Sequence, residues 1–554
     1  MDVKIYSALK RNAKGQNGGN DMKKWKRTTG LVLSAVLAAG LCACGNGGQN
    51  AGKSSVPFNQ TGYPIVNDKV TIKVMAPNWG NVKDFNELAD VKEYEELTNV
   101  HVDWQYFTGD ASEKLSLAFA AKNNIPDLFL MADMSSSTVD KYGEDGVLMA
   151  VEDLISAYAP NVQKAIEEDV DGRKMATAAN GHMYAIPSLF RSPMEKIRGI
   201  SFINEEWLEK LNLPMPSTTD ELYRTLAAFK EQDPNGNGEA DEVPLTLYWD
   251  NNTSGVASLF GAWGVSSAYT GAGGSCMSGP FFVKNNKVVV SNMQDEYKEA
   301  VKFFHQLYSE GLMNIDAFTG DKKSIAARIK AEPYTAGMFN DWDGTIAGPF
   351  AKSSQTYTAM SPLKGPKGEQ NMFKPVYGVF ANNYIAANTK YPEIVMRWAD
   401  GTADPDTSYK WNKGPGNYQI INGKYQTVLK DEVGGVANNY AFPVMGITES
   451  WFTEHVDLLN QPQDAYKGKI NEMCMPYATM MTVEHLRYQS EERKVLEANL
   501  PQIIEYSKQR EAEWITKGSI DEEWDKHIQQ LKSMNVEEIQ KIMQTAADRW
   551  NETE

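Results

Sequence analysis

Residues 69–107 alternate between two hydrophobic periods, and this alternation most strongly limits the folds open to the chain. In KVTIKVMAP the apolar residues recur at every second position, with Val70, Ile72 and Val74 on one face of a strand. DFNELADVKEYEELTNV then carries apolar residues three positions apart, as on a helix, and VHVDWQYF alternates again. A second helical pattern around residues 115–121 leads into IPDLFLMAD. This strand and helix repetition predicts a mostly parallel sheet with helices on its faces.

In sheets of this kind, ligands bind beyond the carboxyl ends of the strands. Trp79 and Asp133 each come just after a predicted strand. We therefore expect both side chains where a ligand could contact them.

The C-terminus reads as helical. In KGSIDEEWDKHIQQL, Ser519 stands three residues before Glu522, the spacing of a capping box at a helix start. Trp524, Ile528 and Leu531 then form one apolar stripe, which predicts that this helix packs on a core.

The N-terminus has the pattern of a secretion signal. From Met22 a basic stretch precedes an apolar run over residues 31–41, which is too short for a bilayer span of about 20 residues. LCAC, ending at Cys44, resembles a bacterial lipobox, whose cysteine becomes the lipid-modified new N-terminus. We expect residues 1–43 to be a signal peptide and residues 44–66 a flexible, lipid-anchored tether.

Two alternatives exist within this region. Residues 1–21 are polar and glycine-rich, so Met22 is the expected initiator. Cys42 competes as the lipid acceptor, but bulky Leu41 before it suits cleavage less well than Ala43 before Cys44. The remaining cysteines, Cys276 and Cys474, could form a disulfide in an oxidising exterior or be free.

Charge and motif content exclude some function classes. The chain of 554 residues has 72 acidic against 55 basic residues, a formal charge of -17, which repels phosphate backbones and argues against nucleic acid as a partner. It contains no G-x-S-x-G, no H-E-x-x-H and no phosphate-binding glycine loop followed by lysine. We therefore expect a protein that is not an enzyme and has no catalytic residues.

The decapeptide DPNGNGEADE, residues 233–242, has the pattern of a calcium loop. Calcium prefers six to eight oxygen ligands, supplied in such loops from alternate positions around a glycine turn. The alternate positions are Asp233, Asn235, Asn237, Glu239 and Asp241. A bidentate glutamate is usual at position 12, where this chain has a proline, and Glu242 at position 10 is the replacement candidate. A polar turn without an ion is the alternative.

Four segments carry a family resemblance. PDLFLMAD, GHMYAIPS at 181–188, NTKYPEIVMRWAD at 388–400 and the C-terminal WITKGSIDEEWDKHIQQLKSMNVEEIQKIMQTAADRW together resemble extracellular solute-binding lipoproteins of bacterial carbohydrate ABC importers. The resemblance implies two α/β lobes joined by a hinge, with a sugar bound in the cleft between them. We expect lobe 1 to comprise residues 67–187 and about 340–400, and lobe 2 residues 188–339 and about 401–554.

The resemblance is strongest to the large subclass that includes alginate-binding proteins, which carry an EF-hand-like calcium loop. It implies a structural calcium ion, with Glu239 binding through its backbone carbonyl. The other implied ligands bind through their side chains and are Asp233, Asn235, Asn237, Asp241 and Glu242.

A sugar cleft combines flat aromatic rings with planar hydrogen-bonding groups, because a pyranose has apolar faces and hydroxyls at its edges. Most tryptophans of a chain belong to its core. We select those in loops or at strand ends beside polar residues, with Tyr377 and Trp411 as weaker candidates. Arg191, near an expected lobe crossing, could bind sugar hydroxyls or a uronate, or form an interlobe salt bridge. The selected set is Trp79, Asp133, Arg191, Trp249, Trp263, Trp342, Asp343 and Tyr377.

These observations predict a monomeric, lipid-anchored extracellular binding protein that captures an oligosaccharide and delivers it to ABC transporter permease subunits. Two other classes stay open at this point. A carbohydrate-binding surface protein or sensor subunit would have the same fold without a permease partner. A glycoside hydrolase would need only two suitably spaced carboxylates.

Overall fold

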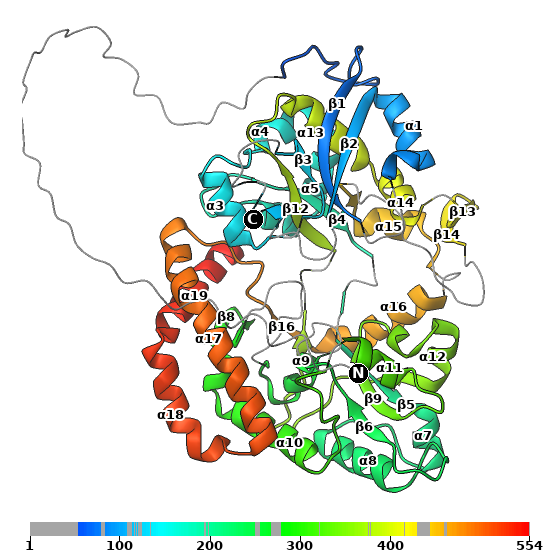
Figure 1. Cartoon of the computed structure of the whole chain (residues 1–554), viewed down its shortest axis with the longest axis vertical. Coiled ribbons are helices and arrows are strands. Elements are labelled where there is room, and N and C mark those ends of the chain that lie inside the picture. The colour runs from blue at the N-terminus through cyan, green and yellow to red at the C-terminus, as the bar shows by residue number, and fades with distance from the viewer. Residues whose placement is uncertain are drawn as a thin grey trace, which may run out of the picture. The chain divides into compact units, whose positions relative to one another are not determined.

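The computed structural model describes residues 54–552, apart from residues 79–83, 108–113, 116, 118, 120–124, 133, 193–195, 198, 250–254, 268–278, 321, 375, 377, 415, 429–443 and 459–461. Its helices and strands form two lobes, each with its own sheets and its own covering helices (Figure 1). Within these described residues, no helix is both long enough and apolar enough to span a bilayer.

A six-stranded sheet forms the centre of the first lobe, in the order β15-β4-β12-β3-β1-β2. β1 pairs in parallel with β2 and with β3, as the alternating pattern predicts. β12 runs antiparallel between β3 and β4, so the sheet is mixed. The strands are β1 (Val70–Pro77), β2 (Val100–Phe107), β3 (Leu128–Phe129), β4 (Ile186–Phe190), β12 (Val379–Ile385) and β15 (Gly446–Ile447).

The predicted helix after β1 is divided in two. Leu88 is extended, with φ −72° and ψ 138°, so the 3-10 helix η1 (Phe85–Glu87) ends before α1 (Ala89–Thr98) begins. Asn99 closes α1 in the left-handed conformation, with φ 58°. The other elements of this lobe are α3 (Ser136–Glu144), α4 (Glu152–Tyr158), α5 (Pro160–Glu168), α6 (Val170–Ala176), α13 (Pro392–Thr402), α14 (Pro405–Lys413), the hairpin β13 (Tyr418–Ile421) and β14 (Lys424–Thr427), and α15 (Glu449–His455).

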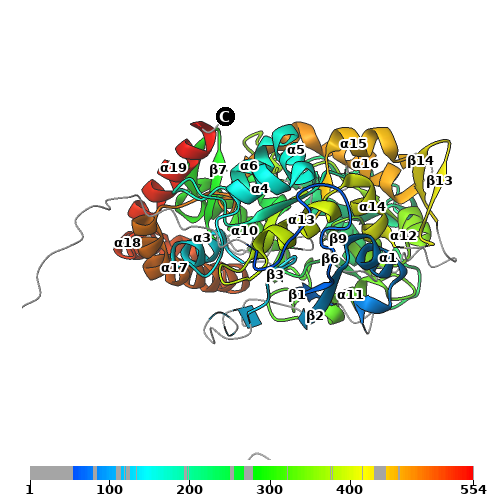
Figure 2. The ribbon, with the colours of Figure 1, turned by 90° about the horizontal axis from the view of Figure 1, so that it is seen from above.

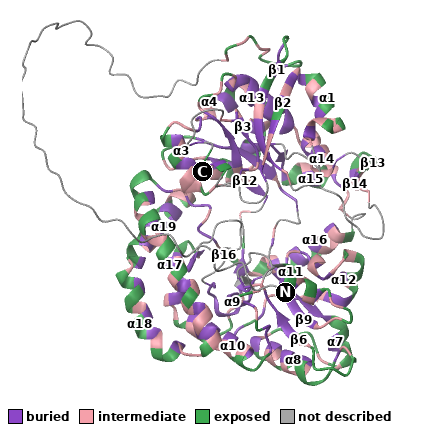
Figure 3. Cartoon of the chain, viewed as in Figure 1, coloured by how far each residue is buried: buried purple, intermediate pink, exposed green. Residues whose placement is uncertain are grey.

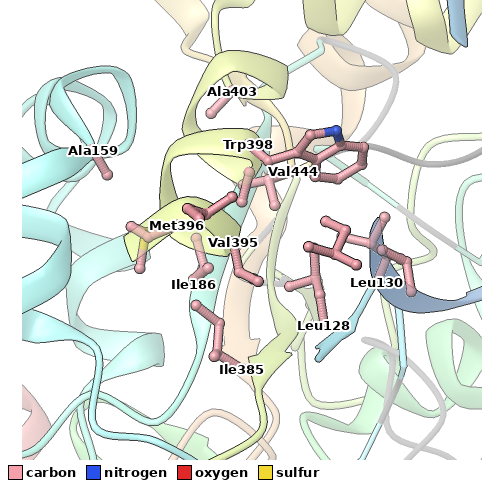
Figure 4. Packing of buried hydrophobic residues seen from close by; sticks show 14 of the residues in the cluster. Leu128, Leu130, Ala159, Ile186, Ile385, Val395, Met396, Trp398, Ala403 and Val444 are labelled. Atoms are coloured by element: carbon pink, nitrogen blue, oxygen red, sulfur yellow. The ribbon is translucent and has the colours of Figure 1, made fainter. Parts of the chain in front are cut away.

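The core of the first lobe lies between this sheet and α13. Ile186 and Ile385, from neighbouring strands, pack against Val395 and Trp398 of α13 (Figure 4). The Tyr94 hydroxyl donates to the carbonyl of Trp398 at 2.8 Å, which ties α1 to α13. Figure 3 shows the resulting continuous buried zone across the sheet.

The second lobe contains two four-stranded sheets. The first has the order β10-β5-β9-β6 and the second the order β11-β16-β7-β8. The strands of the first are β5 (Ile200–Asn204), β6 (Val243–Thr246), β9 (Ala336–Asp341) and β10 (Tyr357–Ala359). Those of the second are β7 (Phe281–Lys284), β8 (Lys287–Val290), β11 (Met372–Phe373) and β16 (Ala478–Met481).

Helices enclose both sheets of the second lobe. α19 packs on α17, on α18 and on β8, and Figure 2 shows α17, α18 and α19 together at one side of the molecule. The helices are α7 (Glu205–Lys210), α8 (Thr219–Glu231), α9 (Ala257–Phe260), η3 (Gly261–Trp263), η4 (Ser291–Met293), α10 (Asp295–Ser309), α11 (Lys322–Ile329), η5 (Thr345–Ala347), α12 (Phe350–Thr356), α16 (Pro462–Cys474), η7 (Met475–Tyr477), α17 (Ser490–Lys517), α18 (Ile520–Ser533) and α19 (Val536–Glu552).

The predicted capping box at Ser519 is wrong. Ser519 precedes α18, but its side chain makes no cap hydrogen bond. α17 ends only two residues earlier, with Gly518 left-handed at φ 78°, and Ser519 then has ψ 15° instead of the extended backbone of a side-chain cap. The apolar stripe is confirmed, since Trp524 and Leu531 are buried in this helix.

Sheet membership corrects the expected lobe boundaries. The chain passes between the lobes after β4, again between β11 and β12, and a third time between α15 and α16. Residues 340–371 therefore stay in the second lobe, where β10 pairs with β5. The described residues of 401–455 belong with the first lobe, where β15 pairs with β4. These strand pairings are long-range, so local sequence patterns do not reveal them.

Candidate functional site

The carboxyl end of β9 presents an aromatic ring between two carboxylates. All six residues of β9 are buried, and the strand lies between β5 and β6. The chain leaves the sheet at Asp341, and Trp342 is the first partly exposed residue after it. This is the strand end at which the sequence predicts a sugar contact.

Both flanking carboxylates accept hydrogen bonds from the turn that follows β9. Asp341 is 8% exposed and accepts from the backbone N–H of Ile346 at 2.9 Å, while burial raises its pKa. Asp343 is 6% exposed and accepts from the N–H of Thr345 at 3.0 Å and from its hydroxyl at 2.6 Å. Its second oxygen accepts from Gln463 of α16 at 2.6 Å. Asp343 therefore fixes the backbone beside Trp342, and the indole is the more accessible of these groups.

Two other selected tryptophans lie in the core of the second lobe. Trp249 is fully buried, packs against Phe304 with ring centroids 5.4 Å apart, and donates its indole N–H to Glu511 at 2.8 Å. Trp263 is 7% exposed and packs on Phe303, at 5.1 Å between centroids. The polar, loop-like residues beside them in the sequence give no indication that these tryptophans are buried. Such positions disfavour a direct sugar contact.

The weaker aromatic candidate Trp411 is also a core residue. It is 4% exposed and packs edge-on against Tyr94, with ring centroids 5.6 Å apart. Its place in the first lobe therefore gives it a packing role.

Arg191 is engaged within the first lobe. It follows β4, is 5% exposed, and donates through Nη2 to Asp169 at 2.6 Å and to Asp171 at 3.2 Å. Asp169 is also the N-cap of α6, where its side chain accepts from Gly172. The ion pair therefore joins the end of β4 to the start of α6 instead of linking the two lobes.

Several predicted positions fall outside the described residues. These are Cys44 and the candidates Trp79, Asp133 and Tyr377. Cys276 also lies there, whereas Cys474 is a buried free thiol at the end of α16, and burial raises its pKa to about 12.

The predicted calcium loop connects α8 to β6. Gly236 and Gly238 both have positive φ, 74° and 79°, which gives the tight turn that the spacing requires. Asp233 accepts from the N–H groups of Gly236 at 2.9 Å and Gly238 at 3.0 Å. Lys210 of α7 donates to the carbonyl of Pro234 at 2.9 Å, which attaches the loop to the lobe.

Asp241 lies where two amides of the loop converge. Its carboxylate oxygens accept from Asn235 at 2.8 Å and from Asn237 at 3.0 Å. A half-turn of either amide would bring an oxygen in place of the nitrogen toward the same point. Among the residues the structure describes, no three His, Cys, Asp or Glu side chains already gather as a metal site.

Glu242 supplies a second indication that a cation fits this loop. Its Oε1 is buried and has no hydrogen-bond partner. Burial raises the pKa of Glu242, and the charges of Asp241 and Asp233 raise it further. A buried carboxylate oxygen near two other carboxylates is the local environment that a hard cation would stabilise.

Sequence reasoning missed the contribution of α16. Gln463 and Lys467, one turn apart on this helix, both contact the segment that follows β9. A buried lysine has no sequence signature of its own, since lysine is normally a surface residue. Their spacing of four residues becomes informative only once the partner segment is known.

Comparison with known proteins identifies the family. A model of the bacterial extracellular solute-binding proteins matches residues 79–410, more than half of the chain. The chain belongs to this family. The solute-binding protein therefore has the two-lobed α/β fold that the resemblance implies, and the prediction that it is not an enzyme is confirmed.

Relatives of this solute-binding protein extend over most of its length. It is 28% identical, over 94% of its own chain and 97% of the relative, to the fructooligosaccharide ABC transporter substrate-binding protein FusA of Streptococcus pneumoniae serotype 4. The structure of FusA in complex with kestose aligns with a TM-score of 0.76 and 26% identity, covering 87% of this chain and all of that one. A FusA EF-hand mutant in complex with fructo-nystose aligns with the same TM-score, identity and coverage.

Proposed function

We propose that this solute-binding protein captures an oligosaccharide outside the cell and delivers it to an ABC transporter permease. One observation carries the proposal at the level of the site. Trp342 presents a partly exposed indole at the end of a buried strand, on a turn whose carboxylates are already hydrogen-bonded. A ring fixed in this way is suited to stack on the apolar face of a pyranose or furanose. The similarity to FusA over nearly the whole chain supports the substrate class.

The transport mechanism would be ligand-stabilised closure. A sugar that contacts both lobes binds the closed arrangement more tightly than the open one and so shifts the population toward it. The three passages of chain between the lobes are the segments about which such a motion can occur. The permease would then recognise the closed form, with the binding protein acting as a monomer.

The substrate can be identified with a thermal-shift screen. A ligand present far above its Kd raises the Tm, by mass action on the folded state. We would compare neutral fructooligosaccharides such as kestose with acidic galacturonan oligomers. The proposed substrate class would be contradicted if the Tm rose with neither of these groups and with no other oligosaccharide of two or more units.

Replacing Trp342 with alanine tests the proposed stacking site. We expect oligosaccharide Kd to rise about tenfold to hundredfold, since the ring contributes on the order of 1 to 3 kcal/mol through its buried apolar area. The Tm of the free protein should change by only a few degrees, because Trp342 is partly exposed. Isothermal titration calorimetry measures the first quantity and differential scanning calorimetry the second.

Trp550 provides the matched control. It is also partly buried, but it lies on α19, with its ring against His485. Trp550→Ala should leave sugar affinity unchanged. If Trp342→Ala instead melts far lower and binds sugar as the parent does, Trp342 is a core residue.

We also propose that the 233–242 loop binds calcium as a structural ion. Asp233, Asn235, Asn237, Asp241 and Glu242 would hold it through side-chain oxygens, and Glu239 through its carbonyl. When bound, the ion would supply positive charge to the three carboxylates and stiffen the connection between α8 and β6. The EF-hand mutant of FusA supports the presence of such a loop in a relative.

Glu242→Gln should have opposite effects with and without calcium. In chelator we expect a higher Tm, because the neutral amide removes a partly buried negative charge beside Asp233 and Asp241. With calcium, affinity for the ion should fall about tenfold or more, equivalent to at least about 1.4 kcal/mol. Scanning calorimetry and terbium luminescence measure the two effects, and sugar affinity should be unchanged.

The pKa of Glu242 also determines the direction in which the stability of the calcium-free protein changes with pH. Since it is raised above 4.5 in the folded, calcium-free protein, its stabilising contribution is present in acid and lost as pH rises through the folded value. Calcium should reverse this loss near neutral pH. Glu239→Gln is the control, because Glu239 would bind only through its backbone carbonyl, which the substitution keeps, while its side chain is exposed. Equal calcium affinity of Glu242→Gln and the parent would remove Glu242 from the site.

Lipid anchoring at Cys44 is proposed from the sequence and from the extracellular character of the family. The mass of the mature N-terminal peptide tests it. A diacylglyceryl-modified Cys44 as the first residue is expected, and a mature chain that starts elsewhere would contradict the proposal.

A further inference from the structure

Lys467 is a fully buried lysine whose ammonium group contacts the backbone of the proposed sugar site. It lies on α16, and its side chain has no solvent exposure. Nζ donates to the carbonyl oxygen of Trp342 and, at 3.0 Å, to the carbonyl oxygen of Ile197. The same nitrogen lies 5.5 Å from the centroid of the Trp342 ring. One charged group therefore holds both the main chain and the ring of Trp342.

A second contact from the same helix reinforces this one. Gln463 is four residues before Lys467, so both side chains lie on one face of α16. Gln463 donates to Asp343 at 2.6 Å, immediately after Trp342 in sequence. The segment after β9 is thus attached to α16 at two successive residues, Trp342 and Asp343.

The other carbonyl bound by Lys467 belongs to the passage between the lobes. Ile197 lies between β4 of the first lobe and β5 of the second. Its neighbour Lys196 forms an ion pair with Glu449, in the first turn of α15 in the first lobe. A continuous set of polar contacts therefore runs from the first lobe, through this passage and Lys467, to Trp342.

Burying an ammonium group carries a large desolvation cost. Moving it out of water is unfavourable unless several acceptors surround it, and an apolar side chain of similar length would fill the same volume without that penalty. Its use here is consistent with a requirement for orientation, because an ammonium with fixed acceptors determines where both carbonyls and the ring lie.

We infer that Lys467 and Gln463 are positioning residues for sugar binding, an inference that rests on the proposed function. They would act through Trp342, by holding its indole in the orientation that a sugar ring requires. Lys467 would also make this orientation depend on the passage between the lobes, so that lobe closure and ring placement are coupled.

A double-mutant cycle distinguishes positioning from general stability. Lys467→Met should weaken oligosaccharide binding about fivefold to tenfold by calorimetry in the parent background. In the Trp342→Ala background the same change should alter Kd less than twofold, because the group through which Lys467 acts is absent. Gln463→Met should show the same dependence on background with a smaller effect, and it serves as the second variant if Lys467→Met does not fold.

A spectroscopic measurement reports on the ring directly. In protein labelled with 5-fluorotryptophan, the Trp342 resonance can be assigned by its loss in Trp342→Phe. It should shift in Lys467→Met without any sugar present. Tyr357→Phe is the control, since the buried Tyr357 hydroxyl donates to Ala336 at the other end of β9, at 2.8 Å. That variant should lower the Tm but leave both the Trp342 resonance and the sugar affinity unchanged.

The outcomes separate this inference from the proposed function. Equal losses of affinity from Lys467→Met and Gln463→Met in the parent and Trp342→Ala backgrounds would overturn the positioning role while keeping Trp342 as a sugar contact. An unshifted Trp342 resonance in a folded Lys467→Met protein would overturn it as well. No change in affinity from Trp342→Ala would instead remove the proposed stacking site itself.

Discussion

Glu511→Ala is expected to destabilise the second lobe by about 3 to 5 kcal/mol, because it removes the acceptor of several buried donors. Glu511 lies on α17 with no solvent exposure. Its carboxylate accepts from Trp249 at 2.8 Å, from Ser267 at 2.6 Å and from Tyr297 of α10 at 2.6 Å. Each donor would be left buried without this partner.

Scanning calorimetry should record this change as a fall in Tm of about 10 °C, with the lobe-specific transition resolved if the lobes unfold separately. Glu513→Ala is the matched control, two positions further along α17. Its side chain is partly exposed and pairs with Arg510 and Lys517, so we expect a loss below about 1 kcal/mol. Equal melting of the two variants would contradict a structural role for Glu511.

Asp140→Ala is expected to cost about 3 kcal/mol or more, because it leaves buried arginines short of a counter-charge. Asp140, on α3 of the first lobe, is 1% exposed, and burial raises its pKa even though Arg487 and Arg493 lower it. Arg487 donates to it at 3.1 Å, and Arg493 lies 3.9 Å from its other oxygen. These arginines come from the segment around the start of α17, so the ionic cluster joins the first lobe to the C-terminal helices.

A second substitution tests whether Asp140 and Arg487 stabilise each other. The double variant Asp140→Ala, Arg487→Met should lose less free energy of unfolding than the sum of the two single variants, because the guanidinium that Asp140→Ala leaves without this counter-charge is then also removed. Asp145→Ala is the control, since Asp145 and Lys141 form an exposed pair at the end of the same helix. Strict additivity in urea unfolding would show that Asp140 and Arg487 contribute independently.

Local patterns predicted the local features of this protein. The alternation of Val70, Ile72 and Val74 predicted β1, because one face of that strand is buried. The spacing of DPNGNGEADE predicted a tight loop whose side chains turn inward, and Gly236 and Gly238 adopt the positive φ values that this needs. Both features depend on residues close together in sequence.

Features that depend on distant contacts were not predictable. Trp249 and Trp342 have similar polar neighbours, yet one is enclosed by aromatic residues and Glu511 from α17, and the other is partly exposed. Lys467 looks like a surface lysine until α16 is placed against Trp342 and Ile197. Glu511 is 262 residues from Trp249, and Lys467 is 125 residues from Trp342 and 270 from Ile197.

The position of β12 determines the order in which the protein can be completed. β12 lies between β3 and β4, although most of the second lobe is synthesised between β4 and β12. One edge of β3 and one of β4 consequently stay unpaired until residue 385 is available, and the other edge of β4 until residue 447. Such long-range pairing folds slowly. The first lobe can therefore complete its sheet only after most of the second lobe has been synthesised.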